Sequence, residues 1–218
     1  MKSYLTLALL SISSLTGYAE TLYDQFPSEI NADERYVFYS HGFIVEGTNP
    51  TPIHNEYGTY DFPMIKRRLF EIGGFNLIAH HRPENIDIEK TVNTFESWVN
   101  TLLNAGVEPS DIVLIGFSRG SLITALTSSR FKDRGIKTVL MAVCFNGDIE
   151  TDPPIQLGGN LLSIYETSDR AGNCNKLASR SRLDTFDEIE ISTGRSHGAF
   201  YSPLEEWLRP IRNWLSNE

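Results

Sequence analysis

Short apolar runs recur along the chain and predict the strands of a sheet. They are rich in β-branched and aromatic residues and lie at residues 36–40, 75–81, 111–116, 137–144, 160–166 and, less clearly, 187–192. Most are apolar throughout rather than alternating with polar residues, as in strands that are covered on both faces. The pattern predicts a mostly parallel sheet of about six strands.

Helical patterns separate these runs. Residues 61–73 begin with an aspartate that can cap a helix, and a proline lies in the first turn. Residues 87–106 begin with another aspartate, end at a glycine and place apolar side chains on one face. A last helix is expected from Pro203, with a kink or break at Pro210. Strands and helices in alternation predict an α/β fold with helices on both faces of the sheet.

The first 19 residues have the features of a secretory signal peptide. Lys2 is followed by a short apolar centre, and Gly17 and Ala19 are small residues at the positions that a signal peptidase requires. Cleavage is expected after Ala19, which places residues 20–218 in the periplasm or outside the cell as a single domain. The alternative is a buried N-terminal helix.

The charge of the chain is acidic, with 28 acidic and 19 basic residues and a net charge of −9. An acidic chain without a basic cluster argues against binding of nucleic acid or an anionic membrane through electrostatics. The sequence indicates no stable membrane anchor in the mature chain and carries no signature of an oligomeric state.

The chain has two cysteines, Cys144 and Cys174. Because an exported protein folds in an oxidising compartment, we expect them to form a disulfide, with two buried free thiols as the alternative. Two cysteines are too few to build a zinc site of their own.

One serine lies between two glycines where a predicted strand meets a predicted helix. The segment reads Gly116, Phe117, Ser118, Arg119, Gly120. Gly-x-Ser-x-Gly in this position is a nucleophile elbow, in which the serine occupies a strained turn and side chains at the glycine positions would clash. The Arg119 amide, at the start of the helix, is then expected to stabilise an oxyanion.

A serine hydroxyl needs a base and an acid to become a nucleophile. His197 lies between the last strand and the last helix, and Asp169 lies just after the strand 160–166. The chain order Ser118, Asp169, His197 is the order found at elbows of this kind. Asp148 is the competing acid, because it follows the preceding strand.

The loop after the first predicted strand supplies a second oxyanion donor. Gly42 allows the chain to approach the serine, and the amide of Phe43 is the expected donor. His41 is expected to brace this loop. A phosphatase site at His41 would need an arginine before it, where Ser40 stands.

The remaining histidines do not indicate a metal. His54, His80 and His81 have no carboxylate at metal-ligand spacing, and residues 80–85 read as a hydrogen-bonded loop. No metal site is therefore expected.

Four segments together resemble the α/β-hydrolase family over most of residues 35–216. They are the sequences SHGF, GFSRG, TSD and RSHGAFY, which occur in this order. The resemblance implies Ser118 as nucleophile, Asp169 as acid, His197 as base, and the amides of Phe43 and Arg119 as oxyanion donors. It also implies hydrolysis of ester or related acyl bonds through an acyl-enzyme, with no cofactor.

The segment between the strands at 137–144 and 160–166 is too short for a cap domain, so an open site is expected. The polar and aromatic loop 45–62 is expected to line its entrance. The sequence thus predicts a secreted serine hydrolase acting on a small-molecule or carbohydrate ester. A peptidase or thioesterase would use the same triad, and a non-catalytic binding protein of this fold is the alternative from another class.

Overall fold

The structure is a computed structural model that describes residues 20–216, and the expected signal peptide lies outside the described residues. The strands are β1 (Leu22–Tyr23), β2 (Tyr36–Ser40), β3 (Ile53–His54), β4 (Gly58–Thr59), β5 (Asn76–Ile78), β6 (Ile112–Phe117), β7 (Lys137–Met141), β8 (Gly158–Glu166) and β9 (Arg182–Ile191). The helices are α1 (Phe62–Phe70), α2 (Ile88–Asn104), α3 (Arg119–Ser129), α4 (Asn175–Arg180) and α5 (Glu205–Ser216).

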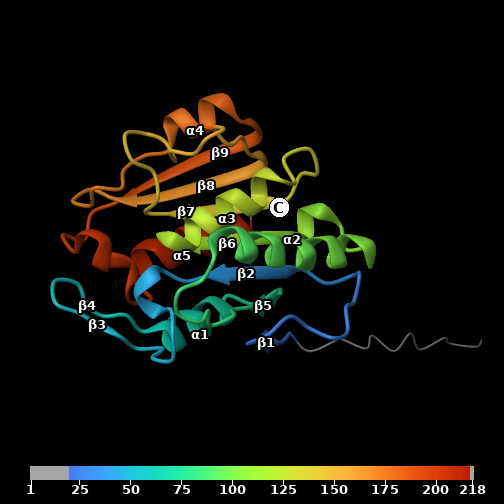
Figure 1. Cartoon of the computed structure of the whole chain (residues 1–218), viewed down its shortest axis with the longest axis horizontal. Coiled ribbons are helices and arrows are strands. Elements are labelled where there is room, and N and C mark those ends of the chain that lie inside the picture. Colours follow the sequence, from blue (N-terminus) through green and yellow to red (C-terminus); the bar gives the residue numbers. More distant parts are fainter. Residues whose placement is uncertain (1–19, 217–218) are drawn as a thin grey trace, which may run out of the picture.

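A seven-stranded sheet runs through the centre of the described part in the order β1-β5-β2-β6-β7-β8-β9 (Figure 1). Every neighbouring pair in it is parallel. The two remaining strands, β3 and β4, form a separate antiparallel ribbon at the end of the molecule where β2 points (Figure 1). The predicted α/β architecture with a parallel sheet is confirmed.

Helices cover both faces of the sheet. On one face, α1 and α5 bury apolar side chains that include Phe62, Leu69 and Trp207. On the other face, α2 buries Val92, Phe95, Val99 and Leu102, as its sequence pattern predicts, and packs beside α3 (Figure 1). Burial from both sides explains why the central strands are apolar throughout.

The ends of the predicted helices follow their capping residues. The carboxylate of Asp61 accepts a hydrogen bond from the Met64 amide at the start of α1, and Asp87 does the same for Lys90 at the start of α2. After α2, Gly106 has a φ of 94°, the left-handed conformation that a glycine adopts most readily beyond a helix end.

The structure differs from the sequence prediction in several details. The sheet gains β1, whose two residues are too few to form a recognisable pattern. The last helix begins at Glu205 rather than Pro203, a shift within the usual uncertainty of helix ends. It also continues through Pro210 without being divided, because packing of Trp207, Leu208 and Ile211 against the sheet holds the residues on both sides of the proline.

The segment between β7 and β8, residues 142–157, contains no helix or strand, and no cap domain is evident. The carboxyl ends of the central strands are therefore not covered by an inserted domain. No helix in residues 20–216 combines the length and the apolar character needed to cross a bilayer.

Candidate active site

Ser118 occupies a strained turn between β6 and α3. Its backbone has φ 54° and ψ −119°, a conformation that non-glycine residues rarely adopt. Its amide donates to the carbonyl of Met141 on the neighbouring strand at 2.9 Å, which holds the turn in place. The predicted elbow is therefore present, with Ser118 at its apex.

The two flanking glycines allow the backbones around the elbow to approach one another. A Cβ at Gly116 would lie 2.5 Å from the carbonyl oxygen of Gly120, and a Cβ at Gly120 would overlap the carbonyl of Ser40. Ser40 ends β2 and is paired in register with Gly116 on β6. The loop that follows β2 therefore begins directly beside the elbow.

Asp169 and His197 meet at the same edge of the sheet. Asp169 follows β8, and His197 lies in a 3₁₀ turn, Ser196–Phe200, between β9 and α5. The Nδ1 atom of His197 lies 2.6 Å from Oδ2 of Asp169. Because an ionised carboxylate only accepts, Nδ1 carries the proton and Nε2 is left as the basic nitrogen.

The competing acid, Asp148, and Asp187 on β9 both have other partners. Asp148 forms an ion pair with Arg180, and the hydrogen bond from this guanidinium lowers the pKa of the Asp148 carboxyl. Asp187 accepts from the indole nitrogen of Trp214 at 3.1 Å. Among residues 20–216, Asp169 is thus the aspartate that bonds His197.

Ser118 and His197 line the same pocket, which has a volume of about 330 Å³. Its walls are mainly apolar and come from Leu122, Ala142, Val143, Phe145 and Ile149, with Arg119 and Glu150 as charged members. Among the residues that the structure describes, His197 bonds Asp169 through Nδ1, and no hydrogen bond joins its ring to the Ser118 hydroxyl. The pocket therefore brings a candidate nucleophile and a candidate base to one apolar space.

The two expected oxyanion donors lie on neighbouring segments. Phe43 and Arg119 are each the first residue of a helical segment, where an amide has no partner within the helix. The guanidinium of Arg119 lies 4.2 Å from the centre of the Phe43 ring, which ties the start of α3 to the loop after β2. Gly42 packs against the Phe117 ring, where a Cβ would lie 3.0 Å from two ring carbons.

A buried charged network holds the loop after β2. The Glu46 side chain, 2% exposed, forms ion pairs with Arg82 at 3.4 Å and with Arg119 at 3.1 Å. Arg82, itself 1% exposed, also donates to the hydroxyl of Ser40 and to the carbonyl of His41. The Arg119 side chain is thus engaged by Glu46.

His41 braces the same loop. Its Nδ1 contacts the Gly42 carbonyl at 2.8 Å, and its Nε2 accepts from the Arg82 amide at 3.0 Å. Burial and the nearby Arg82 guanidinium lower the pKa of His41 well below its ordinary range. A neutral imidazole with both nitrogens occupied fits a bracing role.

The other histidines are also bonded within loops. His54 accepts from two amides of the β3–β4 turn, His80 contacts the Asp24 carbonyl, and His81 contacts the Val45 carbonyl. Among the residues that the structure describes, no three histidine, cysteine or carboxylate side chains gather in a way that could hold a metal ion.

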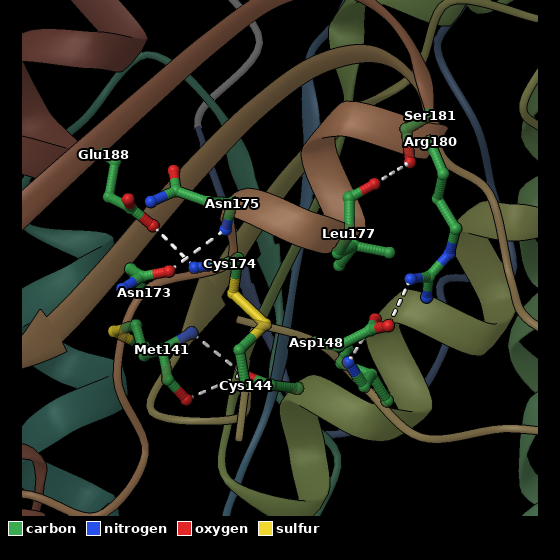
Figure 2. The surroundings of a disulfide bond; sticks show 12 residues. Met141, Cys144, Asp148, Asn173, Cys174, Asn175, Leu177, Arg180, Ser181 and Glu188 are labelled. Atoms are coloured by element: carbon green, nitrogen blue, oxygen red, sulfur yellow. Dashed lines mark hydrogen bonds and ion pairs between the residues drawn. A yellow bond between two sulfur atoms is a disulfide. The ribbon is translucent and has the colours of Figure 1, made fainter. Parts of the chain in front are cut away.

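Cys144 and Cys174 form a disulfide, as expected from the sequence (Figure 2). Their Cα atoms lie 5.3 Å apart, and the Gly172 amide donates to the Cys144 carbonyl beside the bridge. The disulfide links the segment after β7, which forms a wall of the pocket, to the segment that carries Asp169. Figure 2 shows the Asp148–Arg180 ion pair near this bridge.

Three charged residues around the site were not identified from the sequence: Glu46, Arg82 and Glu166. Glu166 is the last residue of β8 and is fully buried. The sequence signal that could have identified Glu166 was a charged residue at the end of an apolar strand, next to a candidate site. Tyr57, from the loop expected at the entrance, lies with its ring 6.0 Å from that of His197.

Comparison with known families gives one sequence match. Residues 48–147 match the model of the phospholipase/carboxylesterase family of α/β-hydrolases. The matched segment includes Ser118 and ends before Asp169 and His197. Among curated proteins, none matches the chain significantly.

Solved structures match over most of the chain. A putative hydrolase of the α/β superfamily from Xanthomonas campestris pv. campestris has a TM-score of 0.53 and 14% identity, covering 84% of this chain and 98% of that one. An esterase from the hyperthermophilic archaeon Pyrobaculum calidifontis has a TM-score of 0.55 and 16% identity, with 86% and 77% covered.

An arylesterase structure has a TM-score of 0.57 and 12% identity, with 87% of this chain and 78% of that chain covered. At these identities the structural matches establish the fold. Together with the family match over residues 48–147, they show that the chain has an α/β-hydrolase fold.

Proposed function

We propose that the protein is a serine hydrolase that cleaves carboxyl esters, with Ser118 as nucleophile, His197 as base and Asp169 as acid. The observation that carries the proposal is the 2.6 Å pair of Asp169 and His197 at a pocket that also contains the strained Ser118. A base oriented by a carboxylate, next to a serine at an elbow, is the arrangement that activates a hydroxyl.

In this mechanism Nε2 of His197 takes the hydroxyl proton while Oγ of Ser118 attacks the ester carbonyl. The amides of Phe43 and Arg119 stabilise the resulting oxyanion. The protonated imidazole then gives its proton to the leaving alcohol, and an acyl-enzyme remains on Ser118. A water molecule, deprotonated by the same histidine, releases the acid and restores the serine.

Two pockets beside the candidate base suggest the substrate class. The apolar pocket at Ser118 suits an acyl group, whereas a second pocket of about 500 Å³ has a polar lining that includes Glu56, Tyr57 and Arg195. This pair suits an ester between an apolar acid and a polar alcohol, such as a carbohydrate. The disulfide is typical of oxidising compartments and supports action in the periplasm or outside the cell.

A panel of p-nitrophenyl esters of increasing acyl length, with matched thioesters and anilides, tests the proposal. Ester turnover by the purified mature chain is expected to be lost in Ser118→Ala. Ser129→Ala, at the other end of α3, is the matched control and is expected to retain it. Equal turnover by the two variants would refute the assignment of Ser118, and preference for thioesters or anilides would refute the ester substrate.

A further inference from the structure

The buried carboxylate of Glu166 connects the two loops that carry Asp169 and His197. One oxygen, Oε2, accepts from the amide and the hydroxyl of Ser168, at 2.7 and 2.6 Å. The other oxygen, Oε1, accepts from the amide and hydroxyl of Thr193 at 2.8 and 3.2 Å and from the Gly194 amide at 2.9 Å. Oε2 therefore binds the loop that carries Asp169, and Oε1 binds the loop that carries His197.

Each of these contacts is close in sequence to a candidate catalytic residue. Ser168 immediately precedes Asp169, and Gly194 lies three residues before His197. The Ser168 hydroxyl also accepts from the Ser196 amide at 3.2 Å, next to the histidine. Glu166 and Ser168 therefore bond the backbone on the approach to both partners of the Asp169–His197 pair.

The chemistry of the site requires a carboxylate. The side chain is fully buried, and the protein groups facing its two oxygens are all hydrogen-bond donors. Burial raises the pKa of Glu166, but the hydrogen bonds from Ser168, Thr193 and Gly194 outweigh it and lower the pKa to about 2. An ionised carboxylate accepts through both oxygens, whereas a glutamine would turn a donating amide group toward one of the loops.

We propose that Glu166 is a positioning residue that sets the distance between Asp169 and His197 by bonding their two loops. This inference rests on the proposed function for its kinetic test, because the pair must act in catalysis for its alignment to affect turnover. Small displacements of reacting groups strongly reduce rates, and displacement of about 1 Å can cost 10²-fold.

Glu166→Gln tests the proposal because it keeps the size of the side chain and removes one acceptor. We expect kcat for a p-nitrophenyl ester to fall about 10–100-fold while KM changes less than about twofold. The residues that Glu166 bonds do not line the acyl pocket, and this substrate carries no carbohydrate for the polar pocket that Gly194 lines. We also expect the deshielded NMR signal of the His197 Nδ1 proton to shift or disappear. A residue that only stabilises the fold would leave this signal in place.

Glu190→Gln is the matched control, because Glu190 lies on the adjacent strand β9, is exposed and accepts from the Tyr165 hydroxyl. Its kcat and NMR signal are expected to equal those of the wild type. A folded Glu166→Gln protein with wild-type kcat and an unchanged signal would overturn the proposal.

If Glu166→Gln fails to fold, Ser168→Ala decides the question, because it removes the hydroxyl contacts to Glu166 and Ser196 and leaves the carboxylate bonded to the other loop. A fall in kcat of about tenfold with a shifted signal is then expected, and unchanged values would refute the proposal. If the wild type hydrolyses no ester, the proposed function fails, while the NMR comparison still decides the role of Glu166.

Discussion

His197 Nδ1 lies 2.6 Å from Asp169 Oδ2, although the two residues are 28 positions apart in the chain. Their loops follow the adjacent parallel strands β8 and β9, whose carboxyl ends lie at the same edge of the sheet. The Asp169 side chain is 6% exposed and that of His197 is 21% exposed, so the carboxylate is shielded while the imidazole remains open to a substrate.

Asp169→Asn is expected to lower kcat by about 10²–10⁴-fold, because an amide can donate to Nδ1 and favour the wrong tautomer of His197. Steady-state hydrolysis of a p-nitrophenyl ester measures this effect. Asp148→Asn is the matched control, since Asp148 pairs with Arg180 rather than with the histidine. A loss of kcat in Asp148→Asn equal to that in Asp169→Asn would contradict the assignment of the acid.

Replacement of both cysteines by alanine is expected to lower the free energy of unfolding by about 3–4 kcal/mol, because the bridge closes a loop between residues 30 positions apart. Urea unfolding of the oxidised wild type and the double variant measures the difference.

The same double variant is expected to lose ester turnover at urea concentrations at which it is still folded. The reason is that the bridge joins the pocket wall to the segment carrying Asp169. Loss of activity only together with global unfolding would argue against this link.

Glu46→Ala is expected to cost about 3–5 kcal/mol of stability, because it leaves the buried Arg82 without its carboxylate partner. Glu71→Ala removes an exposed partner of Arg67 and Arg68 and is expected to cost less than about 1 kcal/mol. Chemical denaturation of the wild type and the two variants measures the free energies of unfolding to be compared. Similar costs for the two variants would mean that the buried network contributes no more than a surface pair.

The pH dependence of stability is expected to show the effect of the lowered pKa of Glu166. Its pKa in the folded protein is about 2, below the ordinary glutamate value of 4.5. A lowered pKa favours folding at pH values above 4.5, and this contribution is lost as the pH falls toward 2. Unfolding free energies of the wild type and Glu166→Gln should therefore converge over this range. A difference that is constant from pH 5 to about pH 2 would be inconsistent with the lowered pKa.

Local sequence signals predicted the elements around the elbow well. The apolar run before Gly116, the glycines and the helix after Ser118 are consecutive in the chain, so their geometry follows from neighbouring residues. The order of Ser118, Asp169 and His197 likewise indicated which acid the structure places beside the histidine. The caps of α1 and α2 were predicted for the same reason.

Some features that depend on distant residues were not predicted. Glu46 and Arg82 are 36 positions apart, and nothing near either residue indicates that they form a buried pair. Glu166 bonds residues up to 28 positions away, through a loop whose path only the fold determines. The strand β1 has only two residues, and its pairing with β5 is likewise a long-range contact.

The proposed function requires Ser118 to be an activated nucleophile. Its most direct test is intact-protein and peptide mass spectrometry after exposure of the mature chain to a fluorophosphonate probe, beside Ser118→Ala and the control Ser129→Ala. One adduct, located on Ser118, is expected in the wild type and the control, and none in Ser118→Ala. A folded wild-type protein without an adduct, or with one on another residue, would show that Ser118 is not the nucleophile.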